Sequence, residues 1–249
     1  MIAVELYTLR DQLRDAEAIA SGLQRVREMG YEGVELAGLG PIEPARLARL
    51  LRDNGLAACS AHIPWDRLRD DLEGVLEDCR TWGCDHVAVP SMPTDYHNAD
   101  GYARFGGEAG EVARTMKSAG VRLSYHNHSF ELERLASETG LERLFQAGGP
   151  ALGTQLDTYW VQYGGGNPAA WIRRYQGRAP TVHIKDMAVV DGEPVMAEIG
   201  EGNLDWTDVL AACQEAGTEV LVVEQDECRG DPFECLAVSR RNLTALGAG

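Results

Sequence analysis

Side chains that bind metal ions stand at the ends of three apolar runs in this 249-residue chain. Asp157, His183 and Glu224 each close such a run. Two carboxylates and an imidazole that converge suit a divalent ion such as Mn²⁺, Mg²⁺, Co²⁺ or Zn²⁺, with water or substrate oxygens completing its shell. Taken singly, each residue is explained as well by a helix cap, a solvated carboxylate or a buried, hydrogen-bonded histidine. Three such residues at neighbouring strand ends favour a shared metal site.

A fourth ligand is expected from the run that precedes Asn127. His126, His128 and Glu131 are the candidates. His126 and His128 are two residues apart, so on a strand their side chains share one face. One of them can therefore bind the ion while the other acts on a substrate.

Proton-moving groups stand at the ends of the same runs. His128, His62, Glu35 and Lys185 are the candidates. Lys185 shares a strand face with His183 and could hold a substrate oxygen, although an ion pair with a nearby carboxylate would explain it equally well.

The elements that must position these residues follow a repeated order: an apolar run, a polar loop, then an amphipathic stretch that ends near glycine. Eight such units predict a closed parallel barrel, and catalytic residues of such barrels lie at the carboxyl ends of the strands. A doubly wound sheet is the alternative, but its glycine-rich first turn is absent from the segment YTLRD. The expected strands are Ile2–Tyr7, Gly33–Leu36, Ala57–His62, His86–Pro90, Arg122–Asn127, Gly153–Asp157, Thr181–Lys185 and Val220–Glu224.

The segments between the strands predict helices, together with one long loop. Met187–Leu204 interrupts the pattern after the seventh strand and is expected to be an active-site loop. We treat the whole chain, residues 1–249, as a single (β/α)8 TIM-barrel domain. The expected helices include Ala16–Met29, Pro44–Asp53, Leu68–Trp82, Gly107–Ala119 and Trp206–Ala216.

Composition excludes several classes of protein. The chain is 44% hydrophobic and 25% charged, which is ordinary for a globular protein, and its net charge of -16 disfavours nucleic-acid binding. No apolar stretch is long enough to cross a membrane, and we expect a cytoplasmic protein. The six cysteines form no metal-binding cluster and are expected to be reduced, structural thiols. A homo-oligomer is left open.

Six short segments resemble the sugar phosphate isomerase/epimerase family of the xylose-isomerase-like barrel superfamily. They are SAHIP (60–64), YHNHSFEL (125–132), QLDTYW (155–160), VHIKDM (182–187), EIGEGNLDW (198–206) and VVEQDE (222–227). The resemblance implies a metal ion held at the ends of strands five to eight. Asp157, His183 and Glu224 match directly, but many relatives carry glutamate where this chain has His126. We assign the fourth ligand to Glu131, since a carboxylate offsets the charge of the ion better, with His126 as the alternative.

Such a site could chelate a sugar carbonyl and its neighbouring hydroxyl, and so support isomerisation or epimerisation through an enediolate. Loss of a β-hydroxyl would make the same site a dehydratase or lyase. A sugar-binding subunit of a larger enzyme is a third reading, and a repair endonuclease is opposed by the charge. We expect a neutral sugar, polyol ketone or keto-glycoside as substrate. Catalysis is assigned to His128, Lys185 and His62, and substrate contacts to His126, Trp65, Trp160, Arg10 and Glu35.

Overall fold

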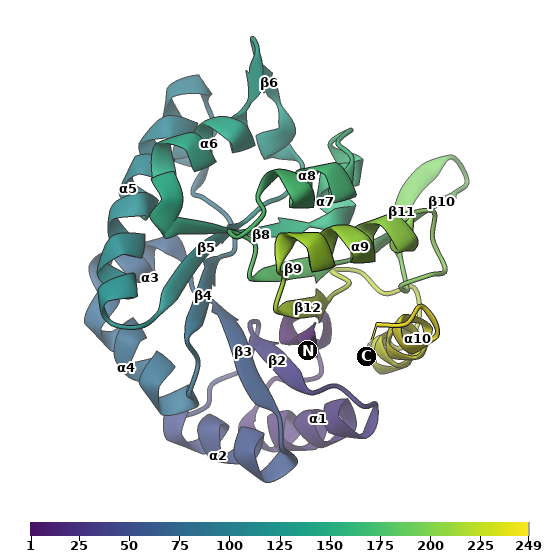
Figure 1. Ribbon diagram of the computed structural model, residues 1–249. Helices are drawn as coiled ribbons and strands as arrows, with labels where there is room; N and C mark the ends of the chain where they lie inside the picture. The colour runs from purple at the N-terminus through teal and green to yellow at the C-terminus, as the bar shows by residue number, and fades with distance from the viewer. Residues whose placement is uncertain (249) are drawn as a thin grey trace.

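Eight short parallel strands pair side by side and close into a barrel, which confirms the predicted (β/α)8 architecture (Figure 1). The computed structural model describes residues 1–248. Closure joins β1 to β12, with Ile2 opposite Leu221, so the first and last strands lie side by side. Around the barrel the strands are β1 (Ile2–Glu5), β2 (Gly33–Leu36), β3 (Ala57–His62), β4 (His86–Val89), β5 (Arg122–His126), β8 (Leu152–Asp157), β9 (Thr181–Ile184) and β12 (Val220–Val223).

Helices surround the barrel, and polar caps and glycines set their ends (Figure 1). The Asp15 carboxylate accepts hydrogen bonds from the first turn of α1, and Gly55, Gly83 and Gly217 end α2, α4 and α9 in the left-handed conformation that glycine adopts without strain. The helices are α1 (Ala16–Glu28), α2 (Pro44–Asn54), α3 (Trp65–Asp70), α4 (Leu72–Trp82), α5 (Ala99–Ser118), α6 (Gly140–Gly148), α7 (Thr158–Tyr163), α8 (Pro168–Arg174), α9 (Trp206–Ala216) and α10 (Pro232–Ala245).

Two of the predicted helices have different bounds in the structure. The stretch Leu68–Trp82 is divided at Asp71, whose backbone leaves the helical region and whose carboxylate caps α4 through the Gly74 amide. The stretch Gly107–Ala119 is the second half of the longer helix α5. Both errors lie at helix boundaries, where capping by a single side chain decides the outcome.

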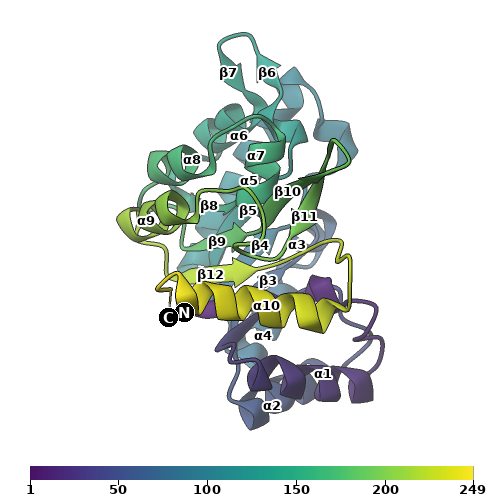
Figure 2. The same ribbon diagram turned by 90° about the vertical axis from the view of Figure 1, so that its right-hand side faces the viewer.

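The predicted loop Met187–Leu204 is partly regular. Residues of β10 (Asp186–Val190) and β11 (Glu193–Ala197) pair as an antiparallel hairpin that extends away from the barrel (Figure 1). A smaller hairpin, β6 (Arg134–Leu135) with β7 (Glu138–Thr139), projects at the top of Figure 2.

The barrel interior is polar near the carboxyl ends of its strands. Glu35 on β2 contacts His183 on β9, and these strands are not neighbours, so the contact crosses the inside of the barrel. Glu5, Gln155 and Asp157 are also fully buried. Buried charges are costly unless they are paired or hold an ion, so this interior indicates a functional site. Among residues 1–248, no helix combines the length and apolarity needed to cross a membrane.

Candidate metal centre and active site

Four side chains converge at the carboxyl ends of four neighbouring strands. His126 on β5, Asp157 on β8, His183 on β9 and Glu224 directly after β12 are all buried, and one ligand atom from each lies within 4.8 Å of the others. His183 Nδ1 is 2.8 Å from Glu224 Oε2, and His126 Nε2 is 3.2 Å from Asp157 Oδ2. The structure therefore brings together the three residues predicted from strand ends.

Glu131 does not join this group, although the sequence favoured it as the fourth ligand. The residue lies in the short 3-10 turn after β5, and its carboxylate accepts hydrogen bonds from Tyr125 Oη at 2.7 Å and from the His128 amide at 2.9 Å. Burial raises its pKa to about 8. Because these donors hold the carboxylate away from the other ligands, His126 takes the position expected of Glu131.

The donors of the four-residue group fit a cation. His126 Nδ1 is 3.1 Å from the Pro90 carbonyl oxygen, so this nitrogen carries the proton, and burial lowers the pKa of the ring to about 4 and keeps it neutral. The lone pair of Nε2 then faces the Asp157 carboxylate. Two acceptors at 3.2 Å repel each other unless a cation lies between them. The facing of the His126 lone pair and the Asp157 carboxylate therefore supports a metal ion at this group.

The carboxylates around His183 also favour a positive charge at this position. Burial lowers its pKa, but the charges of Glu35 and Glu224 outweigh burial and raise the pKa to about 10. The two nitrogens have different partners, since Nδ1 faces Glu224 and Nε2 lies 2.5 Å from Glu35 Oε2. A metal ion on Nδ1 requires the proton on Nε2, and Glu35 is placed to accept a hydrogen bond from it.

A second shell of buried polar groups supports Glu35. Gln155 Nε2 donates to Glu35 Oε1 at 2.7 Å, and Gln155 Oε1 lies 2.7 Å from His62 Nε2. Glu5 lies beside them, and neither of its oxygens has a hydrogen-bond partner. Burial and the charge of Glu35 raise the pKa of Glu5 well above its usual value.

A second group of possible ligands consists of Glu5, Glu35, His62 and His183, one ligand atom of each lying within 4.8 Å of the others. An imidazole that binds ions through both nitrogens must lose its last proton, which here would break the hydrogen bond from His183 to Glu35. We therefore assign these residues to the support of His183.

Lys185 lies among the carboxylates of the site. Its Nζ is 2.6 Å from Glu224 Oε2, 3.1 Å from Asp157 Oδ2 and 2.8 Å from Asp226 Oδ2. Burial lowers the pKa of Lys185, but the three carboxylates together raise it well above its usual value. The ion-pair alternative considered from the sequence is thus present in the structure.

A cavity of about 260 Å³ opens beside these groups at the carboxyl end of the barrel. The ring of His128, one of its lining residues, packs 5.4 Å from Trp160, and its Nδ1 is buried without a hydrogen-bond partner. Burial, followed by the charges of His126 and Lys185, lowers the pKa of His128 to about 3, so the ring is neutral. The cavity is lined by Tyr7, His62, Pro90, Ser91, His126, His128, Glu224 and Asp226.

Four of the predicted substrate contacts lie outside this lining: Trp160, which packs beside it against His128, and Trp65, Arg10 and Glu35. Trp65 is 3% exposed and packs against Phe105 in the core, because α3 begins at Trp65 and turns its ring inward. Arg10 donates to the backbone oxygens of Tyr7 and Asp226, and Glu35 lies below the metal group. Arg10 and Glu35 thus support the site, and Trp65 belongs to the core.

Three polar residues escaped the sequence analysis: Gln155 and Asp186, which are fully buried, and Asp226, which is partly buried. Gln155 precedes Asp157 by two residues, so strand alternation could have placed it on the same face. Asp226, in the EQD segment, had no such signal because it follows the strand. Asp186 organises the long loop, since its carboxylate accepts hydrogen bonds from Met187 N, Gly200 N, Gly202 N, Leu204 N and Trp206 Nε1.

With this geometry established, comparison with known proteins identifies the family. The family model described as "Xylose isomerase-like TIM barrel" matches residues 23–240. The chain belongs to this family. Within the xylose isomerase-like family it is 26% identical over 268 residues to the rhizopine catabolism protein MocC of Rhizobium meliloti, covering 91% of this chain and 81% of that protein.

Two further relatives of this xylose isomerase-like chain span different chemistry. An inosose dehydratase of Clostridium beijerinckii is 24% identical over 173 residues, covering 59% of this chain and 55% of that enzyme. A crystal structure of a sugar phosphate isomerase/epimerase from Parabacteroides distasonis superposes with a TM-score of 0.81 at 20% identity, covering 98% of this chain and 93% of that one. The structural likeness at this identity shows the fold.

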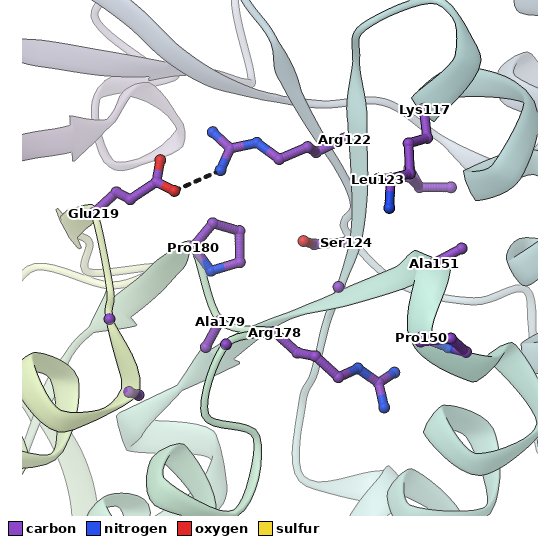
Figure 3. Close-up of a pocket in the computed structure, with 14 residues that line it drawn as sticks. Lys117, Arg122, Leu123, Ser124, Pro150, Ala151, Arg178, Ala179, Pro180 and Glu219 are labelled. Atoms are coloured by element: carbon purple, nitrogen blue, oxygen red, sulfur yellow. Dashed lines mark hydrogen bonds and ion pairs between the residues drawn. The ribbon is translucent and has the colours of Figure 1, made fainter.

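A further cavity, of about 220 Å³, lies at the opposite, amino-terminal end of the strands (Figure 3). Two of its cationic residues already have partners: Arg122 pairs with Glu219, and Arg178 donates to the carbonyl oxygens of Gly149 and Leu152. In xylose isomerase-like barrels, as in other (β/α)8 barrels, this end serves stability.

Proposed function

We propose that the protein is a divalent-metal-dependent isomerase or epimerase of a keto sugar or related polyol, which moves a proton on the carbon next to the carbonyl through an enediolate. The observation that carries the proposal is the group of four buried ligands beside a cavity that contains a neutral histidine. His126, Asp157, His183 and Glu224 would hold the ion. When bound, the ion would polarise the carbonyl and stabilise negative charge on its oxygen.

The residues of the chain divide the remaining tasks. His128 would take the proton from carbon, because its ring lines the cavity and its buried Nδ1 has no hydrogen-bond partner within residues 1–248. Lys185 would balance the charge of Asp157 and Glu224 and stabilise a developing oxygen anion. His62 also lines the cavity and could return a proton or hold a hydroxyl, with Gln155 fixing its ring.

A dehydratase acting on a keto-polyol is the second candidate, and the likeness to an inosose dehydratase favours it. Both reactions begin with the loss of the same proton, and they differ in whether a β-hydroxyl then leaves. The small-molecule substrate would in each case be a sugar or polyol.

Proton exchange tests both candidates. The protein loaded in turn with Mn²⁺, Mg²⁺, Co²⁺ and Zn²⁺ is incubated in D2O with a panel of keto sugars and with inosose. Deuterium on the carbon next to the carbonyl supports the isomerase or epimerase, whereas an enone absorbance with loss of one water by mass supports the dehydratase. Neither signal with any metal and any substrate would refute the proposal.

His128→Gln supplies a check on the assignment of the base. It should abolish exchange and leave metal affinity unchanged, since His128 lies outside the ligand group. Normal exchange in this variant would remove His128 from the mechanism.

A further inference from the structure

A second cavity of about 350 Å³ adjoins the catalytic cavity at the same end of the barrel. Three connections form it: helix α7 after β8, the β10–β11 hairpin after β9, and the segment after β12. Its lining includes Tyr159, Trp160, Tyr163, Met196, Asp226 and Arg229. None of the tasks assigned above uses this cavity.

Two contacts connect the second cavity to the catalytic one. Asp226 lines both cavities, and its carboxylate is held by Lys185. The ring of Trp160, in the second cavity, packs 5.4 Å from the ring of His128, in the catalytic cavity. A molecule whose carbonyl lies near His128 can therefore extend past Asp226 into the second cavity.

The second cavity offers aromatic faces. The rings of Tyr159 and Tyr163 stack with centroids 5.8 Å apart, and Trp160 stands nearly perpendicular to both. Tyr163 is 50% exposed, and Val189 on the adjoining hairpin is 56% exposed. The partly exposed rings of Trp160 and Tyr163, with charged residues such as Arg229 beside them, suit a ring-shaped group that has an apolar face and polar edges.

We propose that the second cavity binds a ring attached to the reacting sugar, so that the substrate is a glycoside with an aryl or glycosyl substituent. The inference rests on the proposed function for the position of the reacting ring. The shared chemistry of the two substituents is a flat ring face, and the test distinguishes them.

Binding of non-reacting glycosides tests the subsite independently of turnover. Dissociation constants are measured by calorimetry for methyl β-D-glucoside, phenyl β-D-glucoside and cellobiose, on the metal-loaded protein. The substituted ring should improve affinity over the methyl glycoside by about tenfold or more, with the larger gain identifying an aryl or a glycosyl substituent. Saturation-transfer NMR should show the strongest contact at the protons of that substituent.

Tyr163 provides a matched pair of variants, because it is half exposed and can be changed without opening the core. Tyr163→Ala should remove most of the gain, and Tyr163→Phe should keep it, since the ring face is retained. Equal affinity for all three glycosides, no detectable binding, or a preference unchanged in Tyr163→Ala would each overturn the subsite. The two tests are independent. Loss of the subsite would leave a positive deuterium exchange with small keto sugars valid, and absence of exchange would leave a measured preference for a ring substituent valid.

Discussion

Replacing Glu35 by glutamine should weaken metal binding without touching a metal ligand. Glu35 Oε2 lies 2.5 Å from His183 Nε2 in a fully buried setting, and the next carboxylate, Glu5, is too far for a hydrogen bond at 3.7 Å. Glu35 is therefore the acceptor that keeps the proton on Nε2 and leaves Nδ1 free for the ion. Loss of such outer-shell partners costs about 10- to 100-fold in metal affinity, or ~1.4 to 2.7 kcal/mol.

The glutamine variant should fall near the upper end of this range. Its amide oxygen could still accept from His183, but its amide nitrogen would then face Gln155 Nε2, which donates to Glu35 in the native protein. Two donors cannot share that contact, so Gln155 would have to turn and disturb its hydrogen bond to His62. The negative charge that makes His183 a better ligand would also be lost.

The assay is a competition titration of Mn²⁺ and Zn²⁺ against a fluorescent chelator. Glu5→Gln is the matched control, since Glu5 is equally buried in the same interior but has no hydrogen-bond partner. We expect about a 100-fold loss of affinity in Glu35→Gln and less than about a threefold change in Glu5→Gln. Native affinity in Glu35→Gln, or an equal loss in both variants, would refute the role given to Glu35.

Three further predictions concern the fourth ligand, the acid stability and the helix packing. His126→Gln should sharply reduce metal uptake measured by elemental analysis, whereas Glu131→Gln should retain it; the reverse result would restore Glu131 as the ligand. Burial lowers the pKa of His86 to about 4 from 6.5, so the unfolded chain binds more protons between these values and stability falls as pH drops through them, by up to about 3 kcal/mol. Urea denaturation at several pH values should show this loss, and it should be smaller in His86→Gln; equal slopes would contradict the assignment. A methyl group on Gly110 of α5 would meet the Gly148 carbonyl of α6, so Gly110→Ala should destabilise by about 1–3 kcal/mol in the same assay, while Gly107→Ala, which meets nothing within 4 Å, should not destabilise. Equal stability of the two alanine variants would count against close helix contact.

The positions of three candidate ligands could be predicted from the sequence because their apolar runs end at polar residues. Asp157, His183 and Glu224 are of this kind, and they converge as expected. The choice between His126 and Glu131 could not be made in this way. It depends on Tyr125, whose hydroxyl reaches across to the carboxylate of Glu131 from within the fold.

Side chains on helices and loops were harder to place than those on strands. Trp65 was expected to contact the substrate. It is instead the first residue of α3, and its ring packs against Phe105 in the core. The hairpin within Met187–Leu204 pairs β10 with β11 between Asp186 and Ala197, and its place depends on a single buried carboxylate rather than on local residue preferences. Tertiary contacts therefore decided what local patterns left open.

The carboxylate of Asp186 divides the long loop into an anchored base and the β10–β11 hairpin, which can change independently of that base. It fixes the backbone on either side of the hairpin, at Met187 and at Gly200 and Gly202, while the hairpin itself extends outward. Insertions or exchanges at the tip of β10–β11 would leave this anchor and the candidate ligand His183 undisturbed. Because Met196 of the hairpin lines the second cavity, such exchanges offer a route to redirect substrate choice by grafting hairpins of different length, with the proposed metal centre kept as it is.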